Sequence, residues 1–270
     1  MTIRVRAPAT TANLGPGFDC AAVALDLWNE LEVSDGEGTP DESHLGIQAF
    51  ARLAPPAGRR FEFVDRIPRE RGLGSSAAVV ALGLVAGALA AGVDPDPESL
   101  LATGVDLEGH GDNLAAALAG GVCLTWENRI ARVADDVPAV AIGIVPETRV
   151  LTAESRAALP EQVTHGDAAF TAGRAALLGA ALASESEGLF AAALDDRLHE
   201  PYRSTLLTEV RQALPDGALG ATLSGSGPTV IVWARRSAAH DCARALEERF
   251  GAEQVVAFAV SRLGAGPTSL

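Results

Sequence analysis

The amino-acid sequence predicts an α+β protein built from two parts, and three observations support this prediction. Stretches with apolar residues at every second position, typical of strands, alternate with longer stretches of helical periodicity. The second half of the chain places several helices between strands, an order that suits helices packed over one antiparallel sheet. The chain has 270 residues, 48% of them hydrophobic, and no internal repeat or low-complexity linker, so it can bury a large core and is neither disordered nor fibrous.

The first predicted part covers residues 1–136 and begins with two strands around an irregular Gly/Pro loop. In chain order, its predicted elements are a strand at 3–10, a strand at 21–33, a helix at 45–53, a strand at 61–67, a long Ala-rich helix from about 75, helices at 97–106 and 113–118, and a hairpin of strands at 122–126 and 129–133. Asp96 is expected to cap the helix at 97–106, with Pro97 at its first position.

The second predicted part covers residues 137–270. Its predicted elements are a strand at 137–145, helices at 152–159, 166–183, 187–198 and 203–214, strands at 218–223 and 228–233, a helix at 237–250, and a strand at 254–260. This order places four consecutive helices between the first strand and the remaining ones, which predicts an antiparallel sheet covered by helices.

The composition excludes several classes of function. The chain has 21 basic and 35 acidic residues, a formal net charge of -14, and every basic residue is arginine. A Walker-A phosphate loop, a Schiff-base enzyme and a protein kinase each need a lysine at a defined place, so all three are excluded. Nucleic acid is not an expected partner, because phosphate backbones are bound by clusters of Lys and Arg that this sequence lacks.

A cytoplasmic location without membrane contact is expected. The uncharged run from Gly72 to Val93 has 22 residues and is long enough to span a bilayer, but its Ala and Gly content and its lack of aromatic and basic flanks favour a buried core helix. The N-terminus has no apolar signal segment. Cys20, Cys123 and Cys242 lie far apart and form no CxxC pattern, so neither a disulfide framework nor a zinc site is predicted.

Three glycine-containing loops are candidates for ligand binding. The segment RGLGSSAA, residues 71–78, lies before the long helix, where unpaired backbone N-H groups and the helix dipole could hold a phosphate, with serine hydroxyls beside them. The alternative is an ordinary turn in which a serine caps the helix. The segment LSGSGP, residues 223–228, has a hairpin loop as its alternative, and NLGPGFD, residues 13–19, is too irregular for a tight turn. No GxGxxG or GxSxG pattern is complete in these loops.

The run DLEGHGDN, residues 106–113, concentrates four ionisable groups and an amide before a helix. Phosphoryl transfer needs a carboxylate for a metal ion and polar groups that orient a hydroxyl, and this run supplies both, although a solvated turn would look the same. His110 has no second histidine at zinc-binding spacing. Thr152, Arg156 and Arg203 stand near predicted helix starts, and single arginines on helices are mostly solvated or salt-bridged, so the residues alone assign them no function.

Three motifs taken in order resemble the GHMP small-molecule kinase superfamily. They are PATTANLGPGFD at 8–19, PRERGLGSSAA at 68–78 and GATLSGSGP at 220–228, and together they span most of the chain. The form ANLGPGFD, followed by GHGDN, is similar to the homoserine kinase family within it. The resemblance implies a ribosomal-protein-S5-like N-terminal α/β half, a ferredoxin-like C-terminal α+β half, and a site between them.

The same resemblance implies ATP- and Mg²⁺-dependent phosphorylation of the side-chain hydroxyl of L-homoserine. It assigns the ATP phosphates to Pro68, Arg71, Gly72, Leu73, Gly74, Ser75, Ser76, Ala77 and Ala78. It assigns Mg²⁺ to Ser76 (or Ser75) and Glu108, with Asp106 as the rival of Glu108. It assigns homoserine to Asn13, Asp19, His110, Thr152, Arg156, Arg203 and Gly225, and the catalytic positions to Asp112, Asn113 and Arg203.

Physical chemistry supports the choice of homoserine. A zwitterionic substrate needs arginines for its carboxylate and an acid such as Asp19 for its ammonium, whereas mevalonate would need no ammonium acceptor. Asn113 stands where related kinases have Asp, so positioning and charge neutralisation are expected to produce the rate. Gly111, Ala116 and Ala22 depart from the family pattern and affect loop geometry. The alternatives are a GHMP kinase for another small alcohol, such as mevalonate, and a non-catalytic nucleotide- or metabolite-binding protein; a homodimer is expected on general frequency alone.

Overall fold

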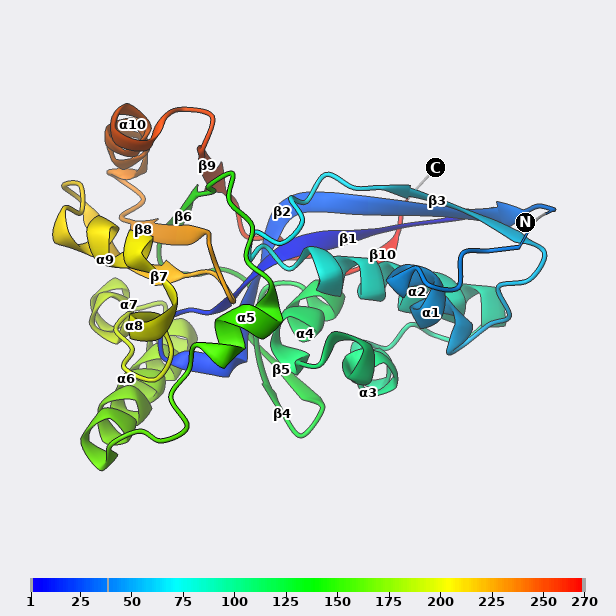
Figure 1. The fold of residues 1–270 in the computed structure, drawn as a ribbon, viewed down its shortest axis with the longest axis horizontal. Coiled ribbons are helices and arrows are strands. Elements are labelled where there is room, and N and C mark those ends of the chain that lie inside the picture. Colours follow the sequence, from blue (N-terminus) through cyan, green and yellow to red (C-terminus); the bar gives the residue numbers. More distant parts are fainter. Residues whose placement is uncertain (1, 38, 269–270) are drawn as a thin grey trace.

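The computed structural model describes residues 2–37 and 39–268 and has two lobes, each built on an antiparallel sheet (Figure 1). The first sheet has strand order β10-β1-β2-β4-β5, and β3 pairs with the same edge of β2 as β4 does. The second sheet has strand order β7-β8-β6-β9. The strands are β1 (Thr2–Asn13), β2 (Gly17–Asp35), β3 (Arg59–Val64), β4 (Val122–Trp126), β5 (Arg129–Ala134), β6 (Val140–Ile144), β7 (Ala218–Leu223), β8 (Val230–Ala234), β9 (Val255–Phe258) and β10 (Gly266–Pro267).

Helices cover the first sheet and connect the strands of the second. They are α1 (Leu45–Ala51), α2 (Ser75–Ala91), α3 (Pro97–Glu108), α4 (Gly111–Ala119), α5 (Thr152–Ala157), α6 (His165–Ser184), α7 (Glu187–Ala193), α8 (Glu200–Arg203), α9 (Thr205–Gln212) and α10 (Ala239–Phe250). Figure 1 shows α1 to α4 below the long strands β1 and β2, and α9 and α10 beside the second sheet. The predicted α+β class with two parts is confirmed; the boundary at 136 stays a prediction.

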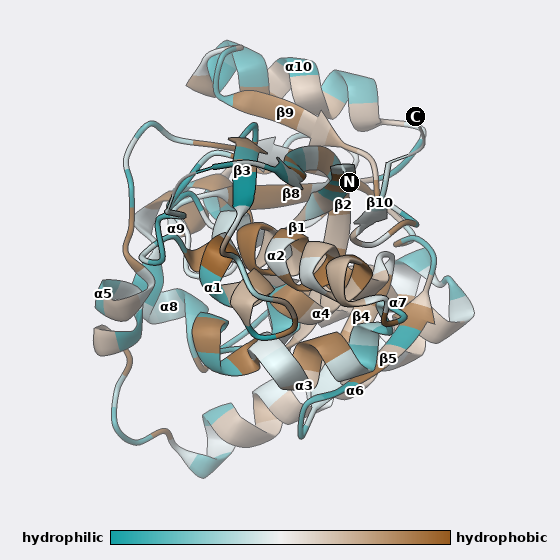
Figure 2. Cartoon of the chain, turned by 90° about the vertical axis from the view of Figure 1, so that its right-hand side faces the viewer, coloured by the Kyte–Doolittle hydropathy of each residue, from teal (hydrophilic) through white to brown (hydrophobic). Residues whose placement is uncertain are grey.

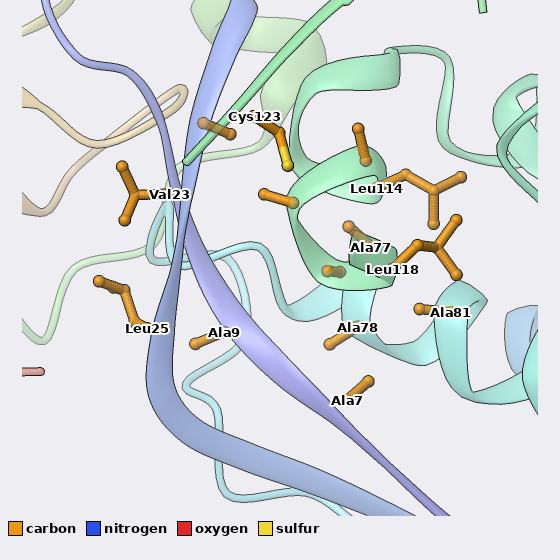
Figure 3. Packing of buried hydrophobic residues seen from close by; sticks show 14 of the residues in the cluster. Ala7, Ala9, Val23, Leu25, Ala77, Ala78, Ala81, Leu114, Leu118 and Cys123 are labelled. Atoms are coloured by element: carbon orange, nitrogen blue, oxygen red, sulfur yellow. The ribbon is translucent and has the colours of Figure 1, made fainter. Parts of the chain in front are cut away.

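The Ala-rich helix α2 is the centre of the first lobe. Its residues from Ala77 to Ala88, apart from Val79, are buried, and it packs against β1, α1, α3 and α4 (Figure 2). Figure 3 shows Ala77, Ala78 and Ala81 of α2 facing Leu114 of α4 and the strand β1. Small side chains permit this close packing: a Cβ atom at Gly83 would lie 2.0 Å from the carbonyl oxygen of Gly46 in α1.

No helix in the described ranges is long and apolar enough to cross a membrane, so the expectation of a core helix for the uncharged run is confirmed.

The second sheet buries both of its faces, and β8 shows how. Val230 and Val232 point into a cluster formed with α9 and α10, whereas Ile231 and Trp233 belong to the main core shared with the first lobe. Because side chains alternate along a strand, an unbroken apolar run such as β8 is what a sheet buried on two faces requires. The sheet thereby joins the C-terminal helices to the first lobe.

The largest differences between the predicted and observed elements of the second part concern two helices and one strand, and the strand predicted at 137–145 is also shorter, at Val140–Ile144. The helix predicted at 187–198 ends at Ala193, because the buried carboxylate of Asp196 accepts hydrogen bonds from the backbone N-H groups of residues 198, 199 and 200 and so starts a new turn. The helix predicted at 203–214 is the shorter α9, because the Ser204 hydroxyl caps α9 at the Leu207 N-H, and Arg203 instead ends the separate short helix α8. Strand β10 was not predicted; its two residues pair with Val5 and Arg6 of β1.

Candidate active site

The three glycine loops meet between the two lobes. The side-chain amide of Asn13, in the first loop, donates to the carbonyl of Gly225 in the third, at 2.9 Å. The Ser224 hydroxyl, fully buried, donates to the carbonyl of Gly72 in the second loop at 2.6 Å and lies 2.8 Å from the hydroxyl of Thr11. Loops separated by more than 150 residues in sequence therefore form one connected structure.

The second loop presents the start of α2 to this junction. Gly74 is the N-cap in the left-handed conformation, with φ of 65°, and the helix begins with Ser75 and Ser76. The alternative in which a serine caps the helix is therefore wrong. A Cβ atom at Gly74 would lie 1.8 Å from the Thr10 hydroxyl, and one at Gly72 would lie 2.3 Å from the Ser224 carbonyl oxygen, so only glycine fits either place. The first-turn N-H groups of α2 have no side-chain cap and can bind an anion.

Glu108 lies beside this helix start. The Ser76 hydroxyl donates to its Oε2 at 2.6 Å, and burial raises the pKa of the Glu108 carboxyl to about 7. Asp106, its rival from the sequence, instead pairs with Arg52 at 2.6 Å and points away with more than half of its side chain exposed. Within the described ranges, no three His, Cys, Asp or Glu side chains gather closely enough to hold a metal ion by themselves.

A small cavity of about 60 Å³ adjoins the loops, and both lobes contribute to its wall. Its lining residues are Asn13, Asp19, Glu108, His110, Asp112, Asn113, Thr152, Arg156, Arg203, Gly225 and Ser226. Every residue that the sequence assigned to the substrate lies on this wall, as do Asp112, Asn113 and Glu108. The structure thus brings residues 13 and 225, at opposite ends of the chain, to one place.

Opposite charges meet within the cavity. Arg156 of α5 donates through Nη2 to Asp19 at 2.7 Å and through Nε to Nε2 of His110 at 2.6 Å. Figure 1 shows α5 in front of α4, at whose start His110 stands. Burial, together with Arg156, lowers the pKa of His110, so this imidazole is neutral at pH 7 and accepts the hydrogen bond.

Asn113 is oriented from outside the cavity. Its Oδ1 accepts a hydrogen bond of 2.6 Å from the Thr10 hydroxyl, and its amide NH₂, which donates to Asp112 Oδ1 at 3.4 Å, keeps a second hydrogen for the cavity. The neighbouring Asp112 is 3% exposed, and burial raises its pKa to about 6. Asn113 can therefore donate to a hydroxyl in the cavity but cannot take its proton.

Arg203 also lines the cavity. Its Nε donates to the Ser155 carbonyl at 3.3 Å, and its guanidinium lies 5.0 Å from the centre of the Phe18 ring. Arg156 lies 5.6 Å from the same ring. Two guanidinium groups near one aromatic ring can bind a carboxylate.

A second cavity, of about 420 Å³, shares the start of α2. Its lining residues are Asn29, Asp41, Ser43, His44, Leu45, Arg69, Glu70, Ser75, Ser76 and Val79. Ser75 and Ser76 thus stand between this larger space and the small cavity that Glu108 lines. A ligand with a bulky end and a phosphate tail could occupy both.

Sequence reasoning missed several residues of the site. Phe18 lies inside the first motif but carries no charge, so it was not predicted to be a site residue. Thr10, Ser155 and Ser226 act through hydrogen bonds to residues far away in the chain, for which a sequence has no signal. His199 lies four residues before Arg203 and could have been found from that spacing alone.

Comparison with known proteins places these motifs in context. The protein-family model for the GHMP kinases N terminal domain matches residues 44–121 of the chain. The family model for the GHMP kinases C terminal matches residues 168–252. The chain is 41% identical to the homoserine kinase of Streptomyces avermitilis, over 94% of this chain and 92% of that protein. It is 42% identical to the homoserine kinase of Streptomyces coelicolor, over 86% of this chain and 84% of that protein. The crystal structure of homoserine kinase from Cytophaga hutchinsonii superposes with a TM-score of 0.86 at 25% identity, over 99% of this chain and 97% of that one.

Proposed function

Because the chain belongs to the homoserine kinase family of the GHMP kinases, we propose that it transfers the γ-phosphoryl group of ATP to the side-chain hydroxyl of L-homoserine. The products are O-phospho-L-homoserine and ADP, so the reaction serves threonine biosynthesis. One observation supports this most directly: a small cavity is lined by a carboxylate, two guanidinium groups, Glu108 and Asn113, and the last two lie next to Ser76 and Gly74 at the start of α2.

The nucleotide is proposed to bind across the start of α2. The N-H groups of Ser75, Ser76 and Ala77 would hold its phosphates, because a helix start offers unpaired donors and a positive dipole. The adjoining cavity of about 420 Å³ would take the nucleoside. This placement brings the terminal phosphate toward Asn113, whose Oδ1 lies 3.2 Å from the position of a Cβ atom on Gly74.

Ser76 and Glu108 fit a magnesium ion. Mg²⁺ prefers oxygen ligands and is usually held by one or two protein groups together with substrate phosphates, which is what this pair can provide. Burial raises the pKa of Glu108, and none of the ion pairs among the described residues includes it. When bound, Mg²⁺ would neutralise phosphate charge during the transfer.

Homoserine is proposed to bind with its two charges matched by the cavity. Asp19 would accept the ammonium group, and Arg156 and Arg203 would bind the carboxylate over Phe18. The Asp19–Arg156 pair is partly exposed, so a zwitterion can insert between its members without leaving either charge unpaired. Thr152 and Ser226, whose hydroxyls lie 3.3 Å apart, would line the other side.

The hydroxyl oxygen of homoserine would form a bond to the γ-phosphorus while the bond from that phosphorus to ADP breaks. Asn113 would orient the hydroxyl, and Asp112 lines the same cavity. The hydroxyl proton would pass to an oxygen of the transferred phosphoryl group. Since Asn113 cannot act as a base, the rate would come from positioning and charge neutralisation.

The test is ADP release measured with homoserine, serine, threonine, mevalonate or no acceptor, at saturating ATP and Mg²⁺. Strong turnover with homoserine alone is expected, with O-phosphohomoserine identified by mass spectrometry. Turnover with mevalonate would indicate a GHMP kinase for another alcohol. Absence of turnover with every acceptor, with ATP still bound, would favour a non-catalytic binding protein.

A further inference from the structure

His199 is buried next to Arg203, which lines the substrate cavity, and has no role in the proposed chemistry. Its side chain is fully enclosed, and its ring stacks on Phe18 with centroids 4.8 Å apart and an interplanar angle of 18°. Phe18 is the ring over which Arg156 and Arg203 lie. The imidazole therefore packs against the same ring as the two arginines.

The hydrogen bonds of His199 select one tautomer. Its Nε2 lies 2.8 Å from the carbonyl oxygen of Gly15, an acceptor, so Nε2 carries the hydrogen. The lone pair of the neutral ring is then on Nδ1, which lies 3.5 Å from Nη1 of Arg203. His199 thus donates to the first glycine loop and accepts from the arginine.

We propose that neutral His199 is a positioning residue that orients the Arg203 guanidinium for the substrate carboxylate. With Nε bonded to the Ser155 carbonyl and Nη1 directed at His199, the guanidinium has two fixed points, and its remaining N-H groups stay available to the cavity. This inference rests on the proposed function only in that the carboxylate belongs to homoserine.

Protonation of His199 would abolish the hydrogen bond that it accepts from Arg203. A second proton would sit on Nδ1, remove the acceptor and place a positive charge beside Arg203. The charged groups facing the ring are Asp196, whose Oδ2 lies 3.6 Å from Nε2, Arg203 on the same turn of chain, and Asp19 from β2. Burial, the largest influence, and Arg203 lower the pKa of His199 against the two carboxylates, so the ring is neutral at pH 7.

Two substitutions separate the two hydrogen bonds of the ring. In His199→Asn the side-chain oxygen can take the place of Nδ1 as acceptor for Arg203, while the donor to Gly15 is lost. In His199→Gln the amide NH₂ can replace Nε2 as donor to Gly15, while the acceptor is lost. We expect KM for homoserine to rise about tenfold or more in the Gln variant and about threefold or less in the Asn variant, with KM for ATP unchanged in both.

The control is Cys242→Ala in α10, which removes a buried contact to the Asp216 carbonyl and should lower Tm without changing either KM. Equal rises of the KM for homoserine in the Asn and Gln variants, or equal changes of the KM for homoserine and for ATP, would overturn the proposal.

In wild-type protein, the ¹⁵N–¹H spectrum should show His199 as the Nε2-H tautomer at pH 7. An Nδ1-H tautomer or an imidazolium would overturn the proposal even if both variants fail to fold. Lack of turnover of homoserine by the wild-type protein would instead contradict the proposed function.

Discussion

The two ends of the site recognise charge by different means. At the homoserine end, charged side chains already satisfy one another: Asp19 pairs with Arg156, and Arg156 also bonds to His110. At the phosphate end, the loop residues offer backbone N-H groups, and the nearby arginines are engaged elsewhere, Arg69 with Asp65 and Arg71 with the Pro146 carbonyl. In the proposed function, an anion at the first end would be bound by side chains that exchange partners, whereas an anion at the second would be bound by backbone N-H groups and Mg²⁺.

The largest effect should follow from altering that backbone geometry. Gly74→Ala would place a Cβ atom 1.8 Å from the Thr10 hydroxyl at a residue with φ of +65°, so the loop must move, and we expect kcat/KM to fall about 1000-fold. Gly92→Ala is the matched control at the other end of α2: its φ is +70°, and its Cβ would meet nothing within 4 Å. This control should lose about 1 kcal/mol of stability and keep its activity. Similar activities of the two variants would show that the loop geometry is not needed.

Removing the charge of Glu108 should have the next largest effect. Glu108→Gln keeps the shape of the side chain but loses the anionic oxygen, so kcat/KM should fall about 100-fold and be partly restored by added Mg²⁺. Asp106→Asn, at a residue paired with Arg52 on the outer side of α3, should leave the Mg²⁺ dependence unchanged. A normal rate in the Glu108 variant together with a loss of activity in the Asp106 variant would indicate that Asp106, and not Glu108, holds the metal ion.

At the homoserine end, the effect should be confined to one substrate. Arg203→Ala removes a guanidinium proposed to bind the carboxylate, and we expect KM for homoserine to rise about 30-fold while KM for ATP changes less than about twofold. Steady-state kinetics with each substrate varied in turn will measure this. Equal changes in both KM values would show that Arg203 supports the whole site rather than one end.

The smallest effect concerns stability and pH. Burial raises the pKa of Glu108 to about 7 in the folded protein, above its ordinary value of 4.5, so a proton on this group favours folding. That stabilisation is complete below pH 4.5 and is lost as the pH rises through 7. Without ligands, Glu108→Gln should therefore gain Tm relative to the wild-type protein between pH 5 and 8. A constant Tm difference over this range would indicate that Glu108 is paired with a cation in the free protein.

The comparison of the two ends also shows which residues a sequence reveals. Asp19, Arg156 and Arg203 were found because they lie in recognisable motifs and carry charge. The choice between Glu108 and Asp106 stayed open, because two carboxylates two residues apart on a helix point in different directions, and only the packing of α3 decides which one faces Ser76. Whether the proposed roles hold depends on the measurements above.

Local pattern by itself determined most elements of this protein. Alternation, glycine and proline breaks, and the cap at Asp96 act over a few residues, so strands such as β4 and helices such as α3 were predicted within two residues. Only the tertiary structure decided contacts between distant residues. These are the pairing of β10 with β1, the hydrogen bond from Ser224 to the Gly72 carbonyl, and the stacking of His199 on Phe18. The physical reason is that a hydrogen bond or a ring contact between residues 150 or more apart leaves no periodic trace in the chain. It exists only after the hydrophobic core has brought the two lobes together.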